Sequence, residues 1–91
     1  MEFEWDPEKA STNSTKHGVE FAEACTVFGD SLELTMPDPS HSVDEFRFIS
    51  LGRSANGRLL IVSYTERDQR IRIISAREAT PRERRQYESG D

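Results

Sequence analysis

The chain has 91 residues, which suits one domain, and a chain of this length buries only about 60–65% of its unfolded surface. Hydrophobic residues make up 34% and charged residues 32%, but the apolar residues cluster in short periodic runs, which excludes a disordered chain. A lone cysteine, Cys25, excludes an internal disulfide, and the sequence shows neither a secretory leader nor an apolar run near the ~20 residues of a membrane span. We therefore expect a cytoplasmic protein.

The charge is divided unevenly along the chain. Residues 1–45 carry a net charge of −9 and residues 46–91 carry +4, and all ten basic residues of the second half are arginine. The planar guanidinium group binds phosphate through two parallel hydrogen bonds and stacks on bases. For any single arginine a solvated surface is the simpler interpretation, but ten arginines without one lysine favour a binding surface.

The N-terminal segment predicts a short strand followed by a helix. Apolar and acidic residues alternate over residues 3–5, which is typical of a strand. Asp6 and Pro7 suit the N-cap and the first turn of a helix running to His17, and Gly18 supplies the left-handed residue that ends one. Residues 11–15 are Ser, Thr and Asn, which are weak helix formers, so packing must hold this helix.

A second helix and another strand are expected next. Apolar residues recur at the helical spacing i, i+3, i+4 and i+7 from Phe21 to Phe28, so we expect a helix over residues 20–28 that Gly29 ends. Apolar and polar residues alternate over residues 32–36, which predicts a strand. The segment 37–42 contains two prolines and two serines and predicts a polar loop.

The second half predicts three more strands, over residues 46–51, 59–65 and 71–75. Asn56-Gly57 is a strong hairpin signal, because both residues of such a turn adopt positive φ, and residues 66–69 predict a second turn. The strand 59–65 is apolar on both faces, so we place it at the centre of the sheet. Thr80 and Glu83 form a capping box that begins a short helix through Tyr87, and residues 89–91 are expected to fray.

Together these elements predict a single α+β domain over residues 1–91, in the order β-α-α-β-β-β-β-α. We expect two helices packed on one face of a curved antiparallel sheet. The predicted core residues are Phe21, Phe28, Leu60, Val62, Ile71 and Ile73.

Several kinds of chemistry have no matching motif. His17, His41 and Cys25 lie far apart in unrelated settings, so we expect no metal site. Gly52 and Gly57 flank a hairpin rather than a strand-to-helix turn, so no phosphate-binding loop is indicated. We expect no cofactor.

The candidate site is a set of arginines on the last two strands. Ile71 and Ile73 share one face of their strand and should point toward the helices, so the alternating arginines should point to the uncovered face. Guanidinium groups there can hold an RNA backbone and stabilise the charge of a phosphorane, while the RNA supplies its own 2′-OH nucleophile. Tyr64 and His17 are the available proton carriers, although packing and helix-dipole roles are their simpler interpretations. The candidate catalytic residues are Arg67, Arg72, Arg77, Tyr64 and His17, and the candidate RNA-binding residues are Lys16, Arg53, Arg70, Arg82 and Arg85.

Short pieces spread over nearly the whole chain carry a family resemblance. In the first half they are Trp5-Asp6-Pro7-Glu8-Lys9, Asn13, Lys16-His17-Gly18-Val19 and Phe21. In the second half they are Arg47-Phe48 through Gly52, Tyr64-Thr65 with Arg67, Arg72 to Arg77, Glu83 and Tyr87. Each piece is weak, but all of them stand in family order, and together the chain resembles the BrnT toxins of the RelE/ParE superfamily.

The resemblance implies a RelE-like fold and a type II toxin, an endoribonuclease that cuts RNA and arrests translation and growth. It implies a partner, a BrnA-type ribbon-helix-helix antitoxin that neutralises the toxin and represses the shared operon with it. The substrate would be RNA, free or on the ribosome, and DNA would be contacted only through the antitoxin complex. We also expect the free toxin to self-associate as a homodimer. The alternative is a non-catalytic binding module whose arginines grip an acidic partner or nucleic acid.

Overall fold

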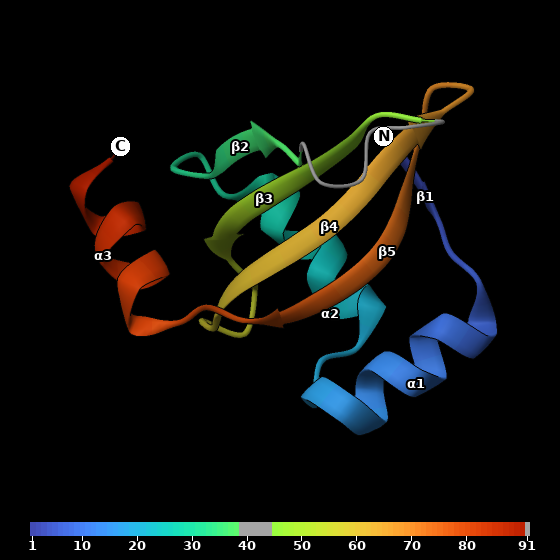
Figure 1. Ribbon diagram of the computed structural model, residues 1–91, viewed down its shortest axis with the longest axis horizontal. Helices are drawn as coiled ribbons and strands as arrows, with labels where there is room; N and C mark the ends of the chain where they lie inside the picture. Colours follow the sequence, from blue (N-terminus) through green and yellow to red (C-terminus); the bar gives the residue numbers. More distant parts are fainter. Residues whose placement is uncertain (39–44, 91) are drawn as a thin grey trace.

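The computed structural model describes residues 1–38 and 45–90, which form a five-stranded sheet with helices behind it and at one end (Figure 1). The strands are β1 (Glu2–Glu4), β2 (Leu34–Pro37), β3 (Arg47–Arg53), β4 (Leu59–Arg67) and β5 (Arg70–Glu78). The helices are α1 (Pro7–His17), α2 (Phe21–Cys25), the 3-10 turn η1 (Thr26–Gly29) and α3 (Pro81–Ser89). The predicted succession of helices and strands is confirmed, with η1 as an addition.

The sheet is mixed rather than antiparallel. Its strand order is β1-β5-β4-β3-β2, so β4 lies at the centre as predicted, and β2 to β5 pair antiparallel. β1 instead pairs parallel with β5, with Phe3 opposite Ile71. The prediction of an antiparallel sheet is therefore wrong for β1. The alternation of residues 3–5 indicates a strand, but a three-residue pattern carries no information on direction.

Several predicted boundaries differ from the structure. The helix expected over residues 20–28 is α-helical only to Cys25, and the strand expected over 71–75 extends from Arg70 to Glu78. Asp68 and Gln69 have φ of 50° and 67° and form the tight two-residue turn between β4 and β5, whereas only Gly57, with φ of 83°, is left-handed in the β3–β4 connection. The expected positive φ at Asn56 is wrong. Most of the predicted polar loop, residues 39–42, lies outside the described residues.

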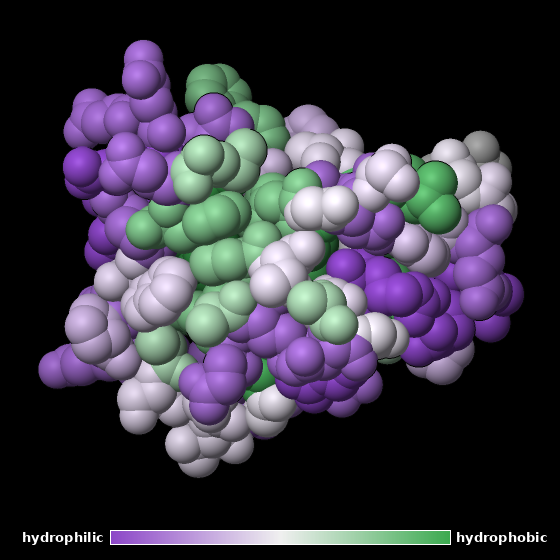
Figure 2. Space-filling model, turned by 180° about the vertical axis from the view of Figure 1, so that it is seen from behind, coloured by the Kyte–Doolittle hydropathy of each residue, from purple (hydrophilic) through white to green (hydrophobic). Residues whose placement is uncertain are grey.

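The main hydrophobic core lies between the sheet and the helices α1, α2 and η1. Five of the six predicted core residues are buried there, and Phe28 is half-buried, with its ring centre 5.5 Å from that of Phe3 and 4.9 Å from that of Tyr64. Figure 2, which views this side, shows apolar side chains reaching the surface in the middle of the face. The buried members are Val19, Phe21, Ala24, Val27, Leu60, Val62, Tyr64, Ile71, Ile73 and Ala76.

A buried amide holds α1 against the edge of β5. The Asn13 Nδ2 group donates hydrogen bonds to the carbonyl oxygens of Ala76 (2.8 Å) and Val19 (3.0 Å), and the Ala76 N–H donates to Asn13 Oδ1 (3.0 Å). β1 pairs only as far along β5 as Arg72, so Asn13 satisfies backbone groups that a longer β1 would have bonded. This packing explains why a helix with a polar middle forms here.

We call the sheet face that carries α1 and α2 the helix-covered face, and the opposite one the open face. The open face was expected to be uncovered, but α3 lies over one end of it (Figure 1). There Tyr87 packs against a small second core of Leu51, Leu59 and Ile61, and its hydroxyl donates to Asp30 Oδ2 (2.7 Å). Within the described ranges, no helix is both long and apolar enough to cross a membrane.

Candidate functional site

An irregularity in β5 shapes the candidate site. Ser63 of β4 lies opposite Ser75 of β5, and the next residue, Tyr64, lies opposite Ile73. Ile74 therefore has no partner in β4, and the strand contains a β-bulge at this point. A bulge inserts one residue into the alternation of side chains, so every side chain after it points to the opposite face from the one it would otherwise occupy.

The bulge brings two of the predicted catalytic arginines to the same face. Arg72 and Arg77 are five residues apart and would point to opposite faces in a regular strand. With the bulge between them, they lie opposite Thr65 and Ile61, which are four residues apart on β4 and so share the open face. A strand rises about 3.3 Å per residue, which separates the two arginines by about 16 Å along β5. Arg77 was expected just after the strand, and that expectation is wrong, since β5 continues to Glu78.

The arginines near the β4–β5 turn are paired with carboxylates. Arg67 Nη2 lies 2.9 Å from Glu45 Oε2, and Arg72 Nη1 lies 3.0 Å from Glu4 Oε2. Arg70 lies 3.6 Å from the other oxygen of Glu4. As predicted, Arg70 and Arg72 alternate with Ile71 and Ile73, which are buried on the helix-covered face. Glu45 and the acids of β1 largely balance the charge of these arginines, so this end of the open face offers oriented guanidinium groups rather than a strong positive field.

Arg77 has a different partner, at the start of α3. Its Nη1 and Nη2 groups donate to Glu83 Oε1 (2.8 Å) and Oε2 (2.9 Å), and these bonds lower the pKa of Glu83 from 4.5 to about 2. The same carboxylate accepts from the backbone N–H of Thr80 (2.9 Å), and the Thr80 hydroxyl accepts from the N–H of Glu83 (3.2 Å). The predicted capping box is thus confirmed, and it also fixes the Arg77 side chain beside α3.

Tyr64 does not lie with the arginines. Its side chain is 4% exposed on the helix-covered face, stacked on Phe48 at a ring distance of 5.6 Å. Its hydroxyl oxygen accepts a long hydrogen bond from Ser50 (3.4 Å), and burial raises its pKa. The expectation that Tyr64 carries protons beside the arginines is wrong in position, because the sheet separates them. The packing role is the one that the structure supports.

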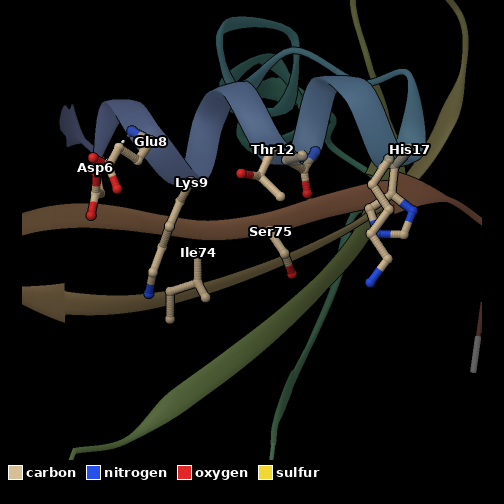
Figure 3. A pocket seen from close by; sticks show the side chains of 9 residues that line it. Asp6, Glu8, Lys9, Thr12, His17, Ile74 and Ser75 are labelled. Atoms are coloured by element: carbon tan, nitrogen blue, oxygen red, sulfur yellow. Dashed lines mark hydrogen bonds between the residues drawn. The ribbon is translucent and has the colours of Figure 1, made fainter.

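His17 and Lys16 line an open pocket of about 380 Å³ between α1 and β5 (Figure 3). Its floor is formed by the bulge residue Ile74 and by Ser75, and Lys9 reaches over the floor from α1. Since Ser75 lies opposite Ser63 on the open face, the pocket and the arginine-bearing face meet at this serine. His17 thus lines a pocket that adjoins the open face at Ser75, a residue between Arg72 and Arg77 in β5.

The remaining predicted RNA-binding residues lie toward α3. Arg53 donates from Nη1 to the Gly57 carbonyl oxygen (3.0 Å), and its guanidinium lies 5.6 Å from the centre of the Tyr87 ring. Arg82 and Arg85 are exposed on α3. These three residues flank the site without lining it.

The sequence contained a signal for the pocket that residue-by-residue reasoning missed. Lys9 and Lys16 are the only lysines of the chain, and a spacing of seven residues places them on the same face of a helix. Thr12 lies between them on that face and also lines the pocket. The role of Ser75 had no sequence signal, because it depends on the bulge.

This arrangement suits an extended anion. The guanidinium groups of Arg72 and Arg77 can reach from two sides toward a phosphate that lies between them, where the hydroxyls of Ser63 and Ser75 stand. Within residues 1–38 and 45–90, no three His, Cys, Asp or Glu side chains gather closely enough to hold a metal ion.

Comparison with known proteins identifies the family. Residues 5–83 match the model of the family described as the ribonuclease toxin BrnT of type II toxin–antitoxin systems. The fold resembles the 1.1 Å crystal structure of the Brucella abortus ribonuclease toxin BrnT, with a TM-score of 0.70 and 23% identity over 88% of this chain and 97% of that one. No functionally curated protein matches. Since the family match covers most of the chain, the protein belongs to the BrnT family of ribonuclease toxins of type II toxin–antitoxin systems.

Proposed function

We propose that this toxin cleaves RNA on the open face, with the scissile phosphate between Arg72 and Arg77 and above Ser63 and Ser75. The observation that carries this proposal is the bulge at Ile74, which puts both arginines on one face. A bulge beside a binding site commonly re-aims a side chain in this way.

The chemistry uses the RNA's own nucleophile. The 2′-oxygen attacks the adjacent phosphorus as its proton passes to a base, and the bond from phosphorus to the 5′-oxygen then breaks as that oxygen takes up a proton. Arg72 and Arg77 stabilise the negative charge that grows on the phosphorane. His17, which lines the adjoining pocket, is the proposed proton carrier. Arg67 and Arg70 position the strand, and Lys16, Arg53, Arg82 and Arg85 contact its flanking phosphates.

One observation favours the alternative of a non-catalytic binding surface. Arg67, Arg70, Arg72 and Arg77 each have a carboxylate partner, so their guanidinium groups are held by the protein's own acids. In that case the face would grip an acidic partner or RNA without cutting. Arginine substitutions distinguish the two functions. In a binding surface they weaken RNA binding alone, whereas in a nuclease they also lower the cleavage rate.

We further propose a RelE-like single domain that acts in the cytoplasm. Its partner is a BrnA-type ribbon-helix-helix antitoxin, through which the complex contacts DNA. The antitoxin covers the open face and supplies acids that replace the RNA phosphates. The half-buried Phe3 and Phe28 pack against the main core on the helix-covered face, and self-association of the free toxin is expected on that face.

The test is cleavage of a defined RNA by the purified protein, with and without ribosomes. A second RNA carries a single 2′-deoxy sugar at the cleaved position. We expect the first RNA to be cut and the second to remain whole at that position. Cleavage of the deoxy RNA at the same position would show that the nucleophile is not the 2′-oxygen and would contradict the proposed mechanism.

A further inference from the structure

The pocket under α1 is lined by two lysines that form no ion pair with the carboxylates of the described residues. Lys9 and Lys16 lie seven residues apart on α1, which is about 10.5 Å along the helix axis. Among the described residues neither lysine takes part in an ion pair, in contrast to the four arginines of the open face. The basic groups of this pocket are therefore free to bind an anion.

The two ends of the pocket differ in charge. Lys16 and His17 stand at the C-terminal end of α1, and Asp6 and Glu8 stand at its N-terminal end, as Figure 3 shows for His17, Asp6 and Glu8. Asp6 Oδ1 accepts a hydrogen bond from the backbone N–H of Glu8 (2.9 Å), which fixes the carboxylate as the helix N-cap. Carboxylates accept hydrogen bonds and cannot donate them at neutral pH. A ligand that spans the pocket thus needs an anion at one end and N–H donors at the other.

We propose that this pocket binds one nucleotide of the RNA strand, with its phosphate at Lys16 and the amino edge of its base at Asp6 and Glu8. This inference rests on the proposed function, in which RNA crosses the open face. Ser75 belongs to both surfaces, so a strand lying between Arg72 and Arg77 can place a neighbouring nucleotide in the pocket. A volume of about 380 Å³ is within the range of small-ligand sites, and Ile74 gives the ligand an apolar contact on the floor.

The charge pattern makes the pocket selective among bases. Cytosine presents an amino group where uracil, a base of the same size, presents a carbonyl oxygen. A carboxylate accepts a hydrogen bond from the amino group but repels the carbonyl oxygen. The pocket therefore selects cytosine over uracil and gives the toxin a sequence preference next to its cut site.

The test is a titration of the ¹⁵N-labelled full chain with cytidine 5′-monophosphate and, separately, uridine 5′-monophosphate. Amide chemical shifts report both the location and the affinity of binding. We expect shifts in α1 and at Ile74 and Ser75, with the cytidine nucleotide bound about tenfold more tightly, in keeping with the selectivity of a base-edge contact. Shifts confined to the open face, or equal affinities for the two nucleotides, would overturn the inference.

Three variants sharpen the assignment, each checked for folding by circular dichroism. Lys16→Gln should weaken the binding of both nucleotides by a similar factor. Glu8→Gln should bring the two affinities close together, because an amide can donate to uracil as well as accept from cytosine. Glu88→Gln, an exposed carboxylate on α3 outside the pocket, is the matched control and should change neither affinity. If Glu8→Gln keeps the parent's preference for the cytidine nucleotide, Glu8 does not recognise the base and this part of the proposal is wrong.

Failure of this inference is distinguishable from failure of the proposed function. The nucleotide titration requires no cleavage, so it reports on the pocket whether or not the protein cuts RNA. If Arg72→Ala still cleaves RNA normally, the proposed cleavage site is wrong, whatever the titration shows. If the arginine variants lose cleavage but the pocket shows no shifts, the pocket inference alone is wrong.

Discussion

Asn13 of α1 and Ala76 of β5 are 63 residues apart in the chain and are joined by two hydrogen bonds, of 2.8 and 3.0 Å. The side-chain amide here acts as a substitute for a neighbouring strand, since it donates to one backbone group and accepts from the other. The pair fastens α1 to the strand that carries the candidate site. The shape of the pocket under α1 therefore depends on it.

We expect Asn13→Ala to destabilise the protein by about 2–4 kcal/mol, because it leaves three buried backbone groups without their partner. Urea unfolding monitored by circular dichroism measures the loss. Thr15→Ala is the control: Thr15 is exposed on the same helix, and its replacement should change the stability by no more than about 0.5 kcal/mol. A loss below 1 kcal/mol for Asn13→Ala, on the scale of an ordinary surface change, would show that the amide bridge is unimportant.

The pair of Arg77 and Glu83 predicts acid sensitivity. The pKa of Glu83 in the folded protein, about 2, lies below its ordinary value of 4.5. Its stabilising effect is therefore complete above about pH 4.5 and is lost as the pH falls through 2. We expect Glu83→Gln to abolish this part of the pH dependence, so that the parent loses roughly 1–2 kcal/mol more than the variant between pH 5 and pH 2. If the free energies of unfolding of the parent and of Glu83→Gln fall in parallel between pH 5 and pH 2, the ion pair does not contribute to stability.

Loss of either arginine of the proposed site should impair cleavage more than RNA binding. We expect Arg72→Ala and Arg77→Ala each to lower the cleavage rate by about 10²–10³, as is usual when one donor to a charged transition state is removed. Arg77→Lys keeps the charge but not the paired donors, so it should also be impaired. Growth after induced expression and cleavage by purified protein are the measurements.

Arg82, Arg84 and Arg85 of α3 serve as controls for this experiment, and their loss should weaken RNA binding modestly without abolishing toxicity. Should Arg72→Ala and Arg77→Ala fold normally and still arrest growth as the parent does, the chemistry lies elsewhere.

The core makes a graded prediction for two phenylalanines. Phe21 is 1% exposed, so Phe21→Ala should cost about 3–5 kcal/mol, which a domain of this size hardly survives. Phe28 is half-buried, so Phe28→Ala should lower the free energy of unfolding by less, roughly 1–3 kcal/mol, because part of the ring is already in water. Thermal melts of both variants check the order. A larger loss for Phe28→Ala would mean that η1 contributes more to the core than its burial indicates.

The antitoxin should bind in a salt-dependent manner if it covers the arginines of the open face. Added salt screens exposed charges, so the affinity should fall steadily between low and high ionic strength. Arg70→Gln should flatten this dependence, since Arg70 is exposed and its loss removes one charge from the interface. An affinity that stays constant from low to high salt would place the interface away from the arginines.

The sequence predicted the helices and strands that follow from local residue patterns. It did not predict the features that depend on how strands pair with one another. Periodicity located the strands, and the capping signals at Asp6 and Thr80 located two helix starts. The parallel direction of β1 and the bulge at Ile74 could not be predicted, because both are set by which backbone groups meet across the sheet. The bulge matters most, since it decides the side on which Arg77 lies.

The candidate site shows the same division. Alternation of residues 70 to 73 correctly indicated that Arg70 and Arg72 point away from the helices. Adjacency in the sequence wrongly grouped Tyr64 with Arg67, although strand residues three apart point to opposite faces. The carboxylate partner Glu4 was missed, because an ion pair between segments 68 residues apart leaves no mark on local composition. Glu83 was recognised only as a capping residue, because its pairing with Arg77 depends on how the chain turns from β5 into α3.

The pairing of β1 with β5 also bears on how the toxin is made. β1 leaves the ribosome first, but its only neighbour in the sheet is a strand that begins at residue 70, and the two arginines of the proposed site lie on that late strand. Chains are made and fold from the N-terminus onward, and contacts between distant segments wait until both are present. A partly made chain that ends before β5 therefore lacks both arginines of the proposed site, and its β1 has no strand to pair with.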